Sequence, residues 1–267
     1  MKTTIIGILN ITPDSFSDGG RYVEAEAAGT YALQMQAQGA DLIDVGAVST
    51  RPSAAPVRED EELRRLAPML DHLCQLVDPN MLSVDAHSTA AAQLALARGV
   101  RILNLYGGFM ADSELPRLLA TQGGRAIIYP SHLSCHAQPA MIGREKFFVE
   151  QITLAEKAGL RREQLILDPG MGLGLGYAGC LELLRNFYLF TRFSCPLAIG
   201  VSRKQHLAKL GGAEYAERDS EMRVEAGLAA AAIAVERGAT YVRTHDVRAT
   251  KQFFTAFDTL RAARLTL

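Results

Sequence analysis

The stretch Gln164-Leu165-Ile166-Leu167-Asp168-Pro169-Gly170-Met171-Gly172-Leu173-Gly174-Leu175-Gly176 indicates how the whole chain is built. A short apolar run, typical of a buried strand, ends at a carboxylate, and proline then fixes the backbone φ of the next residue. Glycine at every second position after the proline lets the backbone approach a bound molecule closely. An acid at the tip of a strand, followed by a loop of little bulk, is typical of a binding site; a solvated aspartate in an ordinary glycine-rich turn is the alternative interpretation.

Strands and helices alternate in the same way along the rest of the chain. Short apolar runs predict strands at Thr4–Leu9, Asp41–Val45, Met81–Val84, Arg101–Leu105, Arg125–Tyr129, Leu165–Leu167, Leu197–Val201 and Thr240–Arg243. Longer amphipathic segments predict helices at Glu24–Gln38, Asp60–Val77, Thr89–Arg98, Ser113–Thr121, Arg144–Ala158, Leu181–Phe190, Ser220–Arg237 and Ala249–Ala262. A glycine just past a helix, as at Gly39, Gly99 and Gly238, predicts a left-handed cap before the next strand.

This repetition predicts an α/β fold, a (β/α)8 TIM barrel. Eight strand–helix units in about 250 residues match that barrel, and no dinucleotide-binding fingerprint follows the first strand, which disfavours an open sheet. No linker or low-complexity tract interrupts the pattern, so we expect residues 1–267 to form a single domain.

Composition narrows the class of protein. The chain has 267 residues, 48% of them hydrophobic and 21% charged, with a net charge of -1, as in a typical globular protein. Without a basic excess or block, we expect no nucleic-acid partner and no membrane partner. The apolar run after Met1 is too short for a signal peptide or a membrane span. The cysteines are scattered without a CxxC pair, so we expect reduced thiols in a cytoplasmic protein; they are Cys74, Cys135, Cys180 and Cys195.

Polar side chains follow the predicted strands, at the end where such barrels place their chemistry. One set offers acceptors and suits a flat heterocycle with adjacent N–H and NH2 donors: Asp85, Asn104 and Asp168. A second set offers donors and positive charge and suits a phosphate-type anion: Arg51, Ser202, Arg203, Lys204, Arg243 and His245. Any one of them alone is more often a solvated or capping residue. Together they imply a phosphorylated or pyrophosphorylated substrate, whose leaving group is released by charge neutralisation.

Several motifs occur in order at these strand tips. They are Gly7–Gly20 (GILNITPDSFSDGG), Gly39–Gly46 (GADLIDVG), Ser49–Pro52 (STRP), Ser83–Asp85 (SVD), Leu167–Gly172 (LDPGMG), Gly200–Lys204 (GVSRK) and Arg243–Val247 (RTHDV). With this set the sequence resembles the dihydropteroate synthase family, folate-pathway enzymes of the pterin-binding TIM-barrel superfamily. The resemblance spans nearly the whole chain, and the first motif and the Ser-Arg-Lys motif are specific to this family among pterin binders.

The resemblance implies that 4-aminobenzoate displaces pyrophosphate from 6-hydroxymethyl-7,8-dihydropterin diphosphate in a homodimeric enzyme that uses Mg2+. The residues implied to hold the pterin are Asp85, Asn104, Asp168, Lys204 and Arg243. Those implied to be catalytic are Lys204, Arg243, His245 and Arg51. Of these, Arg243 and His245 are implied to bind the diphosphate, and Arg51 lies on a loop expected to close over it. Those implied near the second substrate are Ser202, Thr50, Pro52 and Leu173, and Asn10 is the implied Mg2+ contact.

The sequence also departs from the family's pattern. Val48 replaces the family's usual glutamate, and Leu105 replaces its usual aspartate. Leu173 and Leu175 replace a phenylalanine and a lysine, respectively. Asp85 is followed by Ala86-His87, where the family usually has a threonine. The usual Met-His-Met after the fifth strand reads Tyr129-Pro130-Ser131-His132-Leu133, in which His132 is a candidate for the family's histidine.

These departures fall among charges that support the binding residues and in the surroundings of the second substrate. Leucine in place of phenylalanine at Leu173 removes aromatic contact area worth on the order of 1 kcal/mol. We therefore expect an intact pterin site beside an altered second-substrate site. Three hypotheses follow: a synthase, a paralogue that binds pterin but uses another amine or is not catalytic, and a pterin-dependent methyltransferase. The Thr12–Gly20 and Ser202-Arg203-Lys204 motifs disfavour the third.

Overall fold

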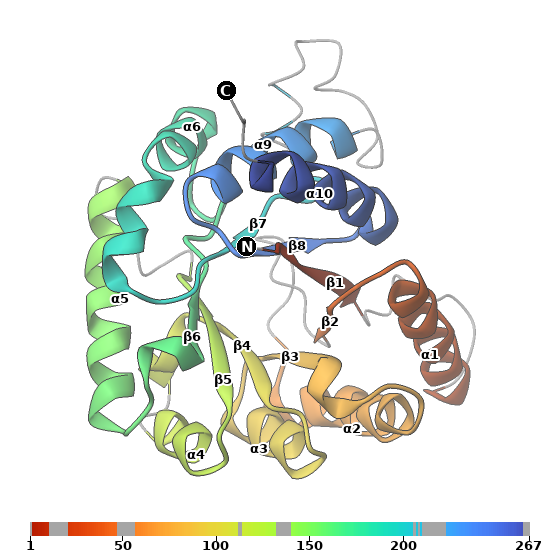
Figure 1. The fold of residues 1–267 in the computed structure, drawn as a ribbon. Coiled ribbons are helices and arrows are strands. Elements are labelled where there is room, and N and C mark those ends of the chain that lie inside the picture. The colour runs from red at the N-terminus through yellow and green to blue at the C-terminus, as the bar shows by residue number, and fades with distance from the viewer. Residues whose placement is uncertain are drawn as a thin grey trace.

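The computed structural model describes residues 2–10, 21–46, 57–111, 114–131, 140–204 and 223–263, together with residues 207 and 209. In these ranges, parallel strands form one eight-stranded sheet that curls into a barrel (Figure 1). The strands are β1 (Thr4–Asn10), β2 (Leu42–Gly46), β3 (Leu82–Ala86), β4 (Ile102–Tyr106), β5 (Arg125–Tyr129), β6 (Leu165–Leu167), β7 (Ala198–Gly200) and β8 (Tyr241–Thr244). Every predicted strand is confirmed, with boundaries within two residues of those expected.

Helices lie on the outside of this barrel, between successive strands (Figure 1). They are α1 (Arg21–Ala37), α2 (Glu59–Leu76), α3 (Thr89–Ala97), α4 (Leu115–Thr121), α5 (Ala140–Lys157), α6 (Tyr177–Arg185), α9 (Val224–Glu236) and α10 (Val247–Ala262). The predicted start of α9 at Ser220 lies outside the described residues. Gly39, Gly99 and Gly238 have φ angles of 96°, 88° and 109°, which confirms the predicted left-handed caps.

The barrel closes between β6 and β7, the two strands at the ends of the sheet order. The strand order runs β6-β5-β4-β3-β2-β1-β8-β7. Leu167 of β6 forms an isolated parallel bridge with Leu197, just before β7, and its N–H donates to the Pro196 carbonyl at 2.9 Å. The eight strand tips therefore surround one opening, and the expected (β/α)8 TIM barrel is confirmed.

Residues that point into the barrel form an apolar layer toward the N-terminal ends of the strands. Its members form one buried cluster, with Tyr241 packed against it: Ile6, Leu42, Ile102, Ile127, Ile166 and Ala198. Because side chains alternate between faces along a strand, the next inward positions lie two residues further on. They are Ile8, Asp44, Asn104, Tyr129, Asp168, Gly200 and Arg243. A mostly polar layer therefore sits directly above an apolar floor.

Two helix predictions were wrong in extent. The helix expected at Arg144–Ala158 begins four residues earlier, at Ala140. The expected helix Leu181–Phe190 begins four residues earlier, at Tyr177, and ends at Arg185. A 3-10 helix follows at Phe187–Phe193, where the chain buries Phe187, Phe190 and Phe193. A spacing of three residues per turn places these three rings on one face, which explains why the tighter helix is used there.

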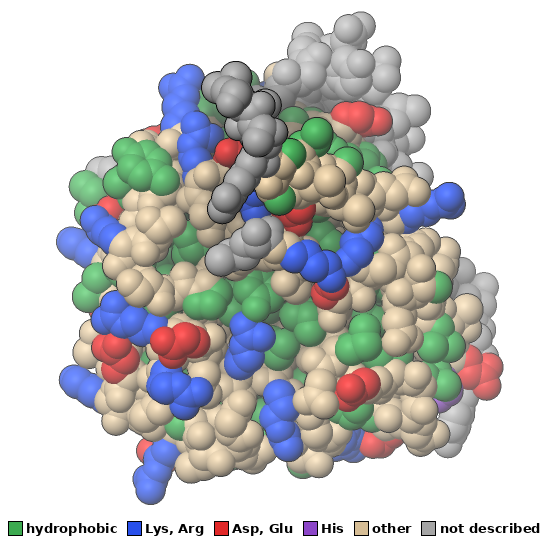
Figure 2. Space-filling model, in the orientation of Figure 1, with side chains coloured by type: hydrophobic (Ala, Val, Ile, Leu, Met, Phe, Trp, Pro, Cys, Tyr) green, Lys and Arg blue, Asp and Glu red, His purple; other side chains and the backbone are tan. Residues whose placement is uncertain are grey.

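The outer surface is mixed in charge. On the face that Figure 2 shows, Lys and Arg side chains are interspersed with Asp and Glu side chains, as the net charge of -1 leads one to expect. Across the residues that the structure describes, every helix falls short of the length and apolar character that crossing a membrane requires. The described cysteines, Cys74, Cys180 and Cys195, are free thiols, whereas Cys135 lies outside the described residues.

Candidate functional site

The polar layer at the C-terminal end of the barrel brings together the acceptor residues predicted from sequence. Asp85 of β3 and Asn104 of β4 are direct neighbours in the sheet register. Asp168 directly follows β6. Its backbone N–H donates to the Ile128 carbonyl of β5 at 2.9 Å, which continues the pairing of these two strands. All three side chains are at least nine-tenths buried. Their acceptor groups therefore lie around one opening, as expected.

Asp44 stands at the centre of this layer, although no role was predicted for it. Its carboxylate is fully buried, and Oδ1 accepts a 2.6 Å hydrogen bond from Ser83. Oδ2 accepts from Asn104 Nδ2 at 2.8 Å and from Arg243 Nε at 2.7 Å. Asp44 thus fixes the orientation of two predicted pterin-binding side chains at once.

The amide of Asn104 is oriented by this bond. Since its nitrogen donates to Asp44, its Oδ1 points away from Asp44, and that atom is buried without a hydrogen-bond partner among the described residues. A buried acceptor without a partner is unfavourable by about 1–3 kcal/mol. An N–H donor on a bound ligand would satisfy it.

Arg243 is the cation at the centre of the layer. Burial alone disfavours its charged form, but the carboxylates of Asp44 and Asp85 outweigh burial and hold the pKa of Arg243 above its usual value. Its NH2 group lies 3.9 Å from Asp85 Oδ2. Arg243 therefore carries a fixed positive charge at the mouth of the barrel.

Asp168 and Lys204 form the opposite side. Asp168 Oδ1 accepts from the Gly170 N–H at 2.8 Å, and Lys204 Nζ donates to the Met171 carbonyl. Burial raises the pKa of Asp168, against the attraction of Lys204, Arg243 and Arg144. Burial likewise lowers the pKa of Lys204, against the attraction of Asp168. Burial thus disfavours the charged form of both side chains. A ligand whose polar edge forms hydrogen bonds with them would offset this loss of solvation.

The glycine-rich loop after Asp168 is held from below by a residue whose role the sequence did not reveal. Arg144 of α5 is 1% exposed, and its guanidinium donates to the carbonyls of Pro169 at 2.6 Å and Leu173 at 2.8 Å. Gly170, Gly172 and Gly174 have φ angles of 70°, 81° and 64°, a region that favours glycine. These left-handed turns leave the carbonyls of Pro169 and Leu173 within reach of Arg144.

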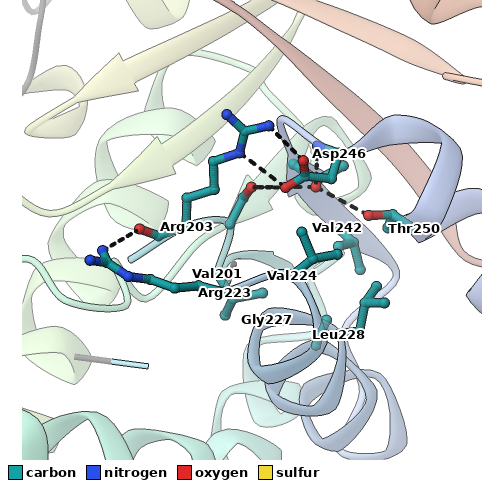
Figure 3. Close-up of a pocket in the computed structure, with 12 residues that line it drawn as sticks. Val201, Arg203, Arg223, Val224, Gly227, Leu228, Val242, Asp246 and Thr250 are labelled. Atoms are coloured by element: carbon teal, nitrogen blue, oxygen red, sulfur yellow. Dashed lines mark hydrogen bonds and ion pairs between the residues drawn. The ribbon is translucent and has the colours of Figure 1, made fainter. Parts of the chain in front are cut away.

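The donor residues after β7 and β8 form a second group. Ser202 Oγ accepts from the His245 backbone N–H at 3.0 Å and lies 3.1 Å from its Nδ1 atom. Arg203 is paired with Asp246, with NH2 2.6 Å from Oδ1, and Figure 3 shows these two side chains facing each other. Arg203 has a φ of 57°, so the turn after β7 directs it toward Asp246. Ser202 and His245 are thus brought together as expected.

The remaining predicted residues are placed as follows. Asn10 is exposed at the end of β1, and its Oδ1 lies beside Gly46 at the mouth. Leu173 is half-buried, with its side chain over Gly170. Leu105 is buried in the layer between strands and helices, away from the mouth. Four residues lie outside the described ranges: Val48, Thr50, Arg51 and Pro52. His132 lies outside them as well.

Within the described ranges, no group of three or more His, Cys, Asp and Glu side chains could hold a metal ion. The described part of the chain therefore has no site that would bind a metal ion through such side chains alone. Mg2+ commonly takes one or two protein oxygens together with water and substrate phosphates. The amide oxygen of Asn10 at the open mouth fits that mode.

Comparisons with known proteins agree with this geometry. A model of the pterin binding enzyme family matches residues 6–245. Dihydropteroate synthase type-2 of Escherichia coli is 38% identical over 253 residues, which cover 91% of this chain and 91% of that protein. A probable bifunctional folylpolyglutamate synthase/dihydropteroate synthase of Haloferax volcanii is 37% identical over 256 residues, and the match covers 92% of this chain but 29% of that longer protein.

A solved structure is similar over almost its full length. Dihydropteroate synthase of Xanthomonas albilineans, solved with 4-aminobenzoic acid, matches with a TM-score of 0.89 and 32% sequence identity. The match covers 98% of this chain and 94% of that one.

Proposed function

The chain belongs to the pterin-binding enzyme family, and on this premise we propose that it is a dihydropteroate synthase. It would join 6-hydroxymethyl-7,8-dihydropterin diphosphate to 4-aminobenzoate and release pyrophosphate, a transferase reaction of folate biosynthesis. The observation that carries the proposal is the buried set of acceptors Asp85, Asn104 and Asp168, which faces the cations Lys204 and Arg243 across one opening.

The acceptor set supports recognition of a pterin. A pterin edge presents adjacent N–H and NH2 donors, which a carboxylate accepts in a bidentate manner. Asp168 supplies such a carboxylate, and the partnerless Oδ1 of Asn104 supplies a further acceptor for a ring N–H. Asp85 accepts from the other edge, while Lys204 donates to ring acceptors and Arg243 lies against the ring face.

The donor residues support handling of the diphosphate. Arg243 retains its charge, and His245 lies beside it after β8. In the reaction, the neutral amine nitrogen attacks the exocyclic methylene carbon and the C–O bond to the diphosphate breaks. Pyrophosphate leaves with the bonding electrons, and the amine proton passes to water. Cations near the departing oxygens lower the barrier by stabilising the negative charge that develops on them. Arg51, on the loop after β2, is proposed to complete this group.

Mg2+ is the proposed cofactor, with Asn10 as its protein contact. When bound, the ion would offset the charge of the leaving diphosphate. Replacement of Asn10 by Ala is expected to raise the Mg2+ concentration needed for half-maximal binding of inorganic pyrophosphate. Unchanged Mg2+ dependence would remove Asn10 from this role.

The second substrate is proposed to bind near Ser202 and Leu173, with Thr50 and Pro52 contributed by the loop after β2. The relative from Xanthomonas albilineans was solved with 4-aminobenzoic acid, which supports that acid as the amine. Leu173 provides an aliphatic rather than an aromatic contact, so we propose weaker binding of 4-aminobenzoate than a phenylalanine would give. We also propose that the protein forms a homodimer and is located in the cytoplasm.

Pyrophosphate release tests the reaction directly. The purified protein with Mg2+ and dihydropterin diphosphate should release pyrophosphate only when 4-aminobenzoate is added, and Asp168→Asn should abolish this release. Pyrophosphate release with another aromatic amine but not with 4-aminobenzoate would favour the paralogue hypothesis. Failure to rescue a synthase-deletion strain, together with no release, would overturn the synthase proposal.

A further inference from the structure

Three aromatic side chains form a wall along the tips of β3, β4 and β5. His87 stacks on Tyr106, with ring centroids 5.7 Å apart and planes inclined by 24°. Tyr106 meets Tyr129 at 5.5 Å and 54°. Tyr129 is the inward position two residues beyond Ile127, so its ring stands at the level of the acceptor layer.

The hydroxyl of Tyr129 reaches the carboxylate of Asp85. Its oxygen donates to Asp85 Oδ1 at 3.1 Å. Among the residues that the structure describes, the other contacts of this carboxylate with charged or titratable side chains are longer: His87 Nε2 lies 3.6 Å from Oδ1, and Arg243 lies 3.9 Å from Oδ2. Both of these distances exceed those of ordinary hydrogen bonds. Tyr129 therefore makes the closest of the three contacts that fix the plane of Asp85.

We infer that Tyr129 is a positioning residue of the pterin pocket, which holds the Asp85 carboxylate in the plane where it meets the pterin edge. The inference rests on the proposed function, since it assigns Asp85 to the pterin.

The chemistry of the pair suits this role. Burial, followed by the charge of Asp85, raises the pKa of the Tyr129 phenol well above its usual value, so the phenol remains a donor. A carboxylate oxygen has two lone pairs, so Oδ1 can accept from Tyr129 and from a ligand at the same time. Without the hydroxyl, Asp85 is free to rotate between its longer contacts, and a pterin would have to order it on binding.

Tyr129→Phe isolates the hydroxyl, because the ring and its packing on Tyr106 remain. Titration calorimetry with 6-hydroxymethyl-7,8-dihydropterin diphosphate, without amine, is expected to show about tenfold weaker binding than in the parent. Binding of inorganic pyrophosphate with Mg2+ is expected to stay within about twofold, because the diphosphate is proposed to bind to Arg243, His245 and Arg51 and not to Asp85. A loss of pterin diphosphate binding without a loss of pyrophosphate binding distinguishes positioning from a general loss of structure, which would weaken the binding of both ligands.

A matched control is present in the same barrel. Tyr241 also points inward, but at the opposite end, where its hydroxyl accepts from Arg125 at 2.6 Å. Tyr241→Phe makes the same chemical change and should leave pterin binding unaltered. Should the parent itself fail to bind the pterin diphosphate, the proposed function is wrong. Should the parent bind and Tyr129→Phe bind equally well or more tightly, or lose both ligands in parallel, the positioning role is overturned.

Discussion

The Nε atom of Arg243 lies 2.7 Å from Oδ2 of Asp44, a carboxylate with no exposed surface. The two residues are 199 positions apart in the sequence. They meet because β8 pairs with β1, which pairs with β2. The ion pair therefore depends on the pairing of β8, the last strand in the sequence, with β1, the first, and in turn it fixes the arginine at the mouth.

Replacement of Asp44 by Asn should lower the free energy of unfolding by about 3 kcal/mol. One amide oxygen cannot accept the three hydrogen bonds that the two oxygens of Asp44 accept, and the new NH2 group would face other donors. Arg243 would also lose its nearest counter-charge. Urea denaturation at neutral pH measures the change. Ser83→Ala, which removes one of the three donors, should lower stability by only about 1 kcal/mol. Equal effects of the two substitutions would contradict the central role of Asp44.

Arg144→Met should weaken pterin diphosphate binding about tenfold. The substitution removes the donors that hold the carbonyls of Pro169 and Leu173, so the loop that presents Asp168 loses its support. Arg192→Met is the matched control, because Arg192 pairs with Glu145, the neighbour of Arg144, on the exposed surface. Calorimetric titration measures both variants. Binding by Arg144→Met within twofold of the parent would show that the loop keeps its shape without the arginine.

Much of this arrangement could be predicted from the sequence. The period of apolar runs indicated all eight strands, and the acids and bases after them indicated the mouth. Asp85, Asn104 and Asp168 were identifiable because they follow three different strands at the same end of the barrel, a coincidence that single solvated or capping residues do not explain.

Asp44, Arg144 and Tyr129 were not identifiable in the same way. Asp44 interrupts an apolar strand, and its partners come from β3, β4 and β8, so its role depends on contacts between distant segments. Arg144 was predicted only as the first residue of an amphipathic helix, where an arginine is usually exposed. Its burial follows from the packing of α5 beneath the loop after β6. Tyr129 was noted as a departure from the family, but only the fold shows that its hydroxyl reaches Asp85.

The stability of the protein should depend on pH through His87. Burial disfavours the imidazolium, but Asp85 and Glu62 attract it more strongly, and the net effect raises the pKa of His87. His87 stacks on Tyr106, and Tyr129 donates to the same Asp85 carboxylate. A raised pKa in the folded state gives stability that is complete below the unfolded pKa of about 6.5 and is lost as pH rises through the folded pKa.

His87→Gln removes this titration while keeping a polar side chain. The difference in unfolding free energy between parent and variant should be greatest near pH 5.5 and should shrink toward about pH 8.5. Glu62 also accepts from the His87 backbone N–H at 2.8 Å, a bond that the substitution leaves in place. A difference that stays constant over this range would show that His87 does not gain charge in the folded protein.

Leu173→Phe should strengthen binding of 4-aminobenzoate by on the order of 1 kcal/mol, or about fivefold. The side chain of Leu173 lies over Gly170 on the loop that follows Asp168, beside the proposed second-substrate site. A ring at this position would add an aromatic face for the aminobenzoate to contact. Titration with 4-aminobenzoate, in the presence of pyrophosphate and Mg2+ to fill the leaving-group side, measures the effect.

Leu175→Phe is the control for this change, because Leu175 packs against the core and against Gly179 of α6 rather than toward the mouth. It should leave aminobenzoate affinity unaltered. A sulfonamide, as an aromatic-amine analogue, should gain affinity in the Leu173→Phe variant in proportion to 4-aminobenzoate. If Leu173→Phe binds neither ligand more tightly, the leucine does not limit the second-substrate site. The chain would then handle its amine through contacts that the rest of the mouth supplies.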